Sequence, residues 1–206
     1  MRKDDIMEGK THAVVGMATA ISMFQPKDTK ELLTALTFGC IGGVICDVDA
    51  SKSDASKAVN LAIGGVIGLC AITAIADMFY DVMFMQRITE STNSMRILLG
   101  VLLLLSTLSY AKGKPHRTQA HSLLTLPLLC IGLGFIVTDA VRFFAIGFVS
   151  HVIIDMLNKK KVYFLYPFKV GMSFGLCKSN GKFSNGLYYI ALTTTILLSI
   201  IVWYNG

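Results

Sequence analysis

The sequence predicts an all-α protein, a polytopic membrane helix bundle of about six or seven transmembrane or re-entrant helices. Hydrophobic residues make up 53% of the 206 residues and charged residues only 16%, whereas soluble domains contain about 25% charged residues. The mean hydropathy is +0.61, and long apolar runs recur along the chain. These observations argue against an ordinary soluble domain and indicate an integral membrane protein.

Seven apolar segments follow one another, separated by polar stretches. Several are shorter than the roughly 20 residues that a perpendicular span needs, and the first two in particular could be re-entrant or interfacial helices. The third contains Gly64, Gly65 and Gly68, which would permit close helix packing. No internal repeat is seen, so residues 1–206 are predicted to form one integral membrane domain. The segments comprise residues 13–24, 32–46, 58–79, 97–111, 123–138, 140–157 and 186–204.

The distribution of lysine and arginine predicts the orientation of the chain. If all seven segments cross, the amino terminus and the loops after the second, fourth and sixth segments share one side. Because Lys and Arg accumulate on the cytoplasmic side, the amino terminus is predicted inside the cell and the carboxyl terminus outside. The predicted outer side holds only Lys27, Lys30, Arg87, Arg96 and Arg142. The predicted inner side holds Arg2, Lys3, Lys10, Lys52, Lys57, Lys112, Lys114, Arg117, Lys159, Lys160, Lys161, Lys169, Lys178 and Lys182.

All four histidines lie at ends of apolar segments that are predicted to face the cytoplasm, together with three aspartates. His151 and Asp155 are four residues apart in the segment that ends at Leu157, so their side chains share one helix face. An ionisable residue inside a membrane segment costs roughly 2.5–3.5 kcal/mol on insertion scales, and therefore needs a partner. The whole set is His12, Asp47, Asp49, His116, His121, His151 and Asp155.

This combination of side chains favours a divalent metal ion. Imidazole and carboxylate ligands together suit zinc first, with manganese or iron as alternatives, better than calcium, which takes oxygen ligands. A bound divalent metal makes water acidic enough near neutral pH to attack a phosphoryl or acyl centre. The expected ligands are Asp47, Asp49, His121, His151 and Asp155. The expected catalytic residues are His12 and His116, as acid–base groups or further ligands, and Arg117, which can hold a phosphate oxygen bidentately.

The two aspartates near the end of the second segment need a particular backbone to act together. On a continuous helix, Asp47 and Asp49 would point about 200° apart. The run after Cys46 is polar and turn-like. We therefore expect an extended or turning backbone here, which would present both carboxylates on one side.

The motifs that carry these residues also resemble a known family. They are Lys10-Thr11-His12, Asp47-Val48-Asp49, the stretch from His116 to Ser122, and His151 with Asp155. In this order, from His12 to Pro167, the chain is similar to bacterial inner-membrane proteins described as metal-dependent hydrolases, the YdjM-like family, also labelled LexA-binding. The resemblance implies a multi-pass helical protein of the bacterial inner membrane with a metal site and hydrolase activity. The label implies control by the SOS response, without direct nucleic-acid binding by the protein.

Three functions are consistent with these observations. The leading one is a membrane-embedded, metal-dependent hydrolase with its site at the cytoplasmic interface, where membrane lipids are its partners and a lipid or lipid-linked phosphoester is its substrate. The second is a transporter for divalent metal ions or protons, although a transport site is expected near the membrane midplane. The third is a non-catalytic stress-response protein or scaffold whose metal has no open coordination position.

Overall fold

The computed structural model describes residues 9–50, 53–80, 91–176 and 182–205, and this part of the chain is all-α, as predicted. Of the charges used to predict orientation, Arg2, Lys3, Lys52, Arg87 and Lys178 lie outside the described residues. The elements are α1 (Gly9–Phe24), α2 (Thr29–Ile45), η2 (Cys46–Asp49), α3 (Asp54–Tyr80), α5 (Thr92–Lys112), η3 (Gln119–His121), α6 (Leu126–Ile136), η4 (Thr138–Ala140), α7 (Val141–Leu157) and α8 (Lys182–Asn205).

Five of the described helical stretches are long and apolar enough to cross a membrane. One of them is α2 continued by η2, which gives 21 residues from Thr29 to Asp49, so the second predicted segment is longer than expected. The first remains short, because α1 has 16 residues. The fifth is shorter still: α6 has 11 residues, which rise only about 16 Å. A single helix of that length does not cross a hydrocarbon core of about 30 Å.

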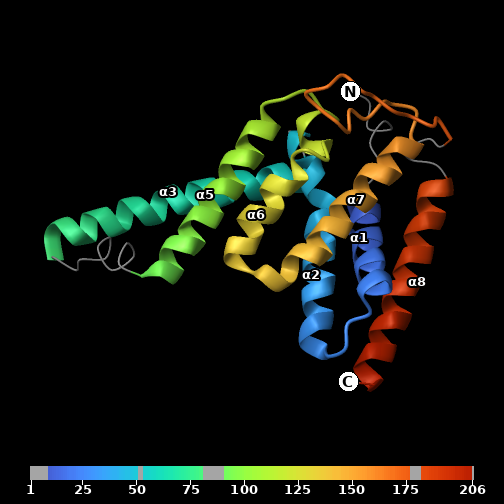
Figure 1. Cartoon of the computed structure of the whole chain (residues 1–206), viewed down its shortest axis with the longest axis horizontal. Coiled ribbons are helices and arrows are strands. Elements are labelled where there is room, and N and C mark those ends of the chain that lie inside the picture. Colours follow the sequence, from blue (N-terminus) through green and yellow to red (C-terminus); the bar gives the residue numbers. More distant parts are fainter. Residues whose placement is uncertain (1–8, 51–52, 81–90, 177–181, 206) are drawn as a thin grey trace.

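Helices α1, α2 and α7 form the centre of the bundle and pack closely on one another. A methyl group at Gly43 would lie 2.4 Å from the carbonyl oxygen of His12, and one at Gly147 would lie 2.4 Å from that of Gly39. A side chain at either position would force the neighbouring helices apart. Helix α8 lies along α1, whereas α3 and α5 extend away from the central bundle (Figure 1).

The close packing predicted for the third segment is wrong for the described part of the chain. A methyl group at Gly64, Gly65 or Gly68 would meet nothing within 4 Å. These glycines lie on α3, which is mostly exposed. Glycine spacing alone therefore did not identify the helices that approach closely.

One end of the bundle collects the beginning of α1, the ends of α2, α5 and α7, and the beginning of α6 (Figure 1). Residues 158–176, here called the strap, arch over this end (orange in Figure 1). Backbone hydrogen bonds hold the strap in place: the N–H of Tyr163 donates to the carbonyl of Arg117 at 2.9 Å, and the N–H of Leu123 donates to that of Phe164 at 2.8 Å. The strap and the loop between α5 and α6 therefore form one cover over the helix ends.

Candidate metal centre

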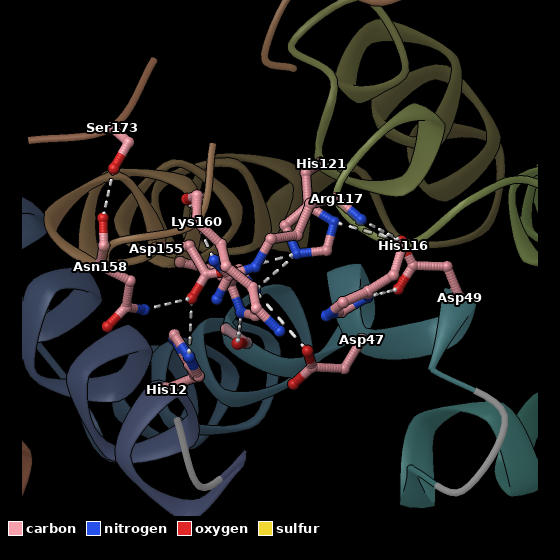
Figure 2. A network of polar contacts seen from close by, with 12 residues as sticks. His12, Asp47, Asp49, His116, Arg117, His121, Asp155, Asn158, Lys160 and Ser173 are labelled. Atoms are coloured by element: carbon pink, nitrogen blue, oxygen red, sulfur yellow. Dashed lines mark hydrogen bonds and ion pairs between the residues drawn. The ribbon is translucent and has the colours of Figure 1, made fainter. Parts of the chain in front are cut away.

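The structure brings all eight predicted site residues together beneath this cover, and Figure 2 labels all of them except His151. They come from four places in the chain: α1, η2, the loop between α5 and α6, and α7. The charged and imidazole groups of the cluster are buried, apart from His116, whose side chain is 19% exposed. The set comprises His12, Asp47, Asp49, His116, Arg117, His121, His151 and Asp155.

The orientation of His151 is fixed by the backbone of a neighbouring helix. Its Nδ1 atom lies 2.7 Å from the carbonyl oxygen of Gly43 on α2. A carbonyl only accepts, so Nδ1 carries the proton and donates it. The Nε2 atom therefore presents its lone pair to the middle of the cluster, as in histidines that bind metal ions.

His121 faces the same point from η3. Its Nε2 atom lies 3.3 Å from Nε2 of His151 and 3.4 Å from Oδ2 of Asp155, while its Nδ1 lies 3.4 Å from Oδ2 of Asp49. Burial lowers the pKa of His121, but the carboxylates of Asp155 and Asp49 outweigh it and raise that pKa to about 9. Without a metal ion, His121 is therefore protonated at neutral pH.

Asp155 is the most connected residue of the cluster. Its Oδ2 atom lies 3.1 Å from Nε of Arg117. Its Oδ1 atom accepts a hydrogen bond of 3.1 Å from Nδ2 of Asn158 and lies 3.5 Å from Nε2 of His12. The ring of His12 stacks on that of His151 with centroids 3.9 Å apart. The carboxylate therefore joins α1, α7 and the loop between α5 and α6.

The two aspartates after Cys46 lie in the 3₁₀ turn η2, which continues α2 directly. The backbone therefore turns but is not extended, so the extended alternative is wrong. The two carboxylates diverge: Oδ1 of Asp47 lies 3.9 Å from Nε2 of His151, whereas Oδ1 of Asp49 lies 2.6 Å from Nδ1 of His116. Asp49 thus lies behind His121, where an outer carboxylate holds a metal-binding imidazole.

Two overlapping groups of donors could hold a metal ion: His12, His151 and Asp155, or Asp47, His121 and His151. Each group has its donor atoms within 4.8 Å of one another. The spacing suits zinc, because bonds of 2.0–2.1 Å in a tetrahedron separate the ligand atoms by about 3.3 Å. Since Nδ1 of His151 is already bonded, its Nε2 can serve only one ion. The two groups are therefore alternative or merged ligand sets for an ion bound to His151.

Two further observations fit the binding of a divalent cation. Within the described residues, Nδ1 of His12 is buried without a hydrogen-bond partner, and an unmade bond at a buried polar group costs about 1–3 kcal/mol. The cluster also holds three carboxylates and one guanidinium. A divalent cation would balance this charge.

Three contributors to the site were not predicted. The side chain of Asn158 follows Asp155 by three residues at the end of α7, a spacing that could have identified it. The carbonyl oxygens of Gly43 and Lys160 could not be identified from the sequence, because every residue has a backbone carbonyl group. Lys160 accepts a hydrogen bond of 3.1 Å from Nη1 of Arg117, so the predicted phosphate-binding guanidinium is already paired with the strap and Asp155.

Comparison with known proteins agrees with the motif resemblance. The sequence model of the YdjM inner membrane protein family matches residues 7–205. Among curated proteins and among solved structures, no match was found. The family match spans nearly the whole chain, and together with the apolar helices it supports a membrane location. The chain therefore belongs to the YdjM inner membrane protein family.

Proposed function

We propose that this protein is a membrane-embedded, metal-dependent hydrolase. The observation that carries the proposal is the convergence of Nε2 of His121, Nε2 of His151 and Oδ2 of Asp155, whose separations are 3.3, 3.4 and 3.9 Å. Asp47 would be a further ligand, since its Oδ1 lies 3.9 Å from Nε2 of His151 and it forms one of the two donor groups with His121 and His151. Zinc suits these ligands and this spacing best, and manganese or iron are the alternatives.

A divalent metal held here would polarise a phosphoryl or acyl oxygen and make water a competent nucleophile near neutral pH. The protein would supply the remaining roles. Arg117, which is paired with Asp155 and with the carbonyl of Lys160, would place positive charge beside an anionic oxygen of the substrate. His116, whose Nδ1 is held 2.6 Å from Oδ1 of Asp49, would move a proton through Nε2. His12 would support Asp155 from α1.

The position of the cluster supports this function over transport. The cluster lies at one end of the bundle, where helices begin and end (Figure 1), whereas transport sites lie near the membrane midplane. A site at the level of the lipid headgroups favours a lipid or lipid-linked phosphoester as substrate. Membrane lipids are then its neighbours and its source of substrate.

The test is hydrolysis by the detergent-purified protein supplied with zinc, manganese or iron. The panel comprises p-nitrophenyl phosphate, bis-p-nitrophenyl phosphate and phosphatidic acid. We expect metal-dependent turnover that falls at least 100-fold in Asp155→Asn. The matched control is Asp54→Asn, because the Asp54 side chain is 99% exposed. Inactivity across the panel in protein that contains stoichiometric metal would contradict the proposal and favour a structural metal.

A further inference from the structure

The strap is strongly basic and contains no acidic residue. Lys159, Lys160, Lys161 and Lys169 lie within residues 158–176, and there is no Asp or Glu in this range. All four lysines are exposed. The strap therefore carries four positive charges on the outer face of the cover.

The same segment exposes large apolar side chains beside its lysines. Phe168 is 65% exposed, Phe174 is 55% exposed and Leu176 is 74% exposed. Large apolar side chains exposed this close together along one segment indicate an interaction site. Basic residues close to exposed aromatic and aliphatic ones are typical of segments that lie in a membrane interface.

The strap is placed at the level where a membrane interface is expected. It lies outside the five stretches that could span a membrane and follows directly after α7. Its inner side is bonded to the site: Nη1 of Arg117 donates to the carbonyl of Lys160 at 3.1 Å, and the N–H of Tyr163 donates to the carbonyl of Arg117 at 2.9 Å. One side of the strap thus faces the candidate metal centre, and the other side faces outward.

We propose that the strap is a binding surface for anionic phospholipid, in which the lysines pair with the phosphate groups and the exposed apolar side chains enter the acyl boundary. Charge complementarity selects this occupant, because the cytoplasmic leaflet is negatively charged and attracts basic segments next to membrane helices. The exposed apolar residues favour a lipid over a soluble anion. This binding does not depend on hydrolysis.

The test measures binding of dioctanoyl phosphatidylglycerol, dioctanoyl phosphatidylcholine and free glycerol phosphate to the detergent-purified full chain. Microscale thermophoresis with a chelator present keeps the readout independent of catalysis. We expect the anionic lipid to bind at least tenfold more tightly than either of the other two ligands. We also expect its affinity to fall with increasing salt.

Two double variants remove the same charge at different places. Lysines near a lipid surface each contribute about fivefold in affinity, so K159Q/K161Q should weaken phosphatidylglycerol binding roughly 25-fold. K27Q/K30Q removes two exposed lysines at the beginning of α2, the end of that helix away from the candidate metal centre. This variant should change the affinity for phosphatidylglycerol less than twofold. F168S should weaken the binding of both lipids and leave the binding of glycerol phosphate unchanged.

Several results would overturn the inference. One is equal affinity for the two lipids, and another is equal loss in the two double variants. Binding of glycerol phosphate as tight as that of phosphatidylglycerol would assign the surface to a soluble anion. A change of oligomeric state in K159Q/K161Q with unchanged lipid affinity would make the strap an interface between copies of the chain.

Discussion

His151 on α7 is anchored by Gly43 on α2: its Nδ1 atom donates a hydrogen bond of 2.7 Å to the glycine carbonyl. The same glycine lets α1 approach, because a methyl group there would lie 2.4 Å from the carbonyl oxygen of His12. One residue without a side chain thus sets the positions of two imidazoles. The orientation of Nε2 of His151 is therefore a property of helix packing.

The first prediction concerns Gly43→Ala. The added methyl group would push α1 from α2 and displace both His12 and the carbonyl that holds His151. Overpacking of this kind costs about 1–3 kcal/mol, and we expect zinc affinity to fall at least tenfold. Thermal unfolding and zinc titration measure the two effects. Gly64→Ala is the control, because nothing lies within 4 Å of that position, and identical behaviour of the two variants would refute the packing argument.

Asn158→Ala tests how Asp155 is held. The side chain of Asn158 donates to Oδ1 of Asp155 at 3.1 Å, and loss of such an outer partner typically lowers metal affinity 10- to 100-fold. Competition with a fluorescent zinc chelator measures this affinity. Ser173→Ala removes a bond to the backbone carbonyl of Asn158 only, and we expect a change below about threefold. Equal losses of zinc affinity in both variants would show that the position of the strap, and not the contact of Asn158 with Asp155, determines that affinity.

Metal binding should release a proton from His121. Its pKa of about 9 means that the metal-free protein carries this proton at pH 7.5, and a metal ligand must be a neutral imidazole. The raised pKa stabilises the metal-free fold below pH about 6.5, and this contribution is lost as the pH rises through about 9. Zinc affinity should therefore increase with pH up to about 9. Calorimetry in two buffers of different ionisation enthalpy should detect the proton at pH 7.5, and identical heats would contradict the prediction.

Arg117→Gln should make the protein more dependent on metal. Arg117 is buried and lies 3.1 Å from Oδ2 of Asp155. Removing one partner of a buried pair costs about 3–5 kcal/mol, and a bound cation would replace the lost charge. We expect zinc to raise the melting temperature more in this variant than in the wild type. Arg142→Gln breaks a partly exposed pair with Glu31, so its response to zinc should equal that of the wild type. An unchanged response in Arg117→Gln would argue against a cation beside Asp155.

The fold class and the charged and imidazole side chains that cluster at one end of the bundle could be predicted from the sequence. Long apolar runs predict helices directly. Because successive helices run in opposite directions, the end of one helix and the beginning of the next lie on the same side of the bundle. The order of the segments is therefore enough to assign His12, His121 and His151 to one end of the bundle. The spacing of His151 and Asp155 also placed both on one face of α7.

What could not be predicted depends on which helices touch. Gly64 and Gly68 have the spacing of a packing motif but face open space, whereas Gly43 makes the close contact. Asp49 and Asp47 have the same chemistry, and only the 3₁₀ turn directs one toward His116 and the other toward His151. Such choices depend on tertiary contacts, which local sequence does not encode.

The most direct test of the central claim is the metal content of protein purified without chelator, measured by elemental analysis. The wild type should carry about one zinc, manganese or iron ion per chain, and the double variant His151→Gln, Asp155→Asn should carry almost none. His116→Gln is the control that should retain the ion, since His116 is not in either candidate donor group. Absence of metal from the wild type, or equal metal in the wild type and the double variant, would contradict the account.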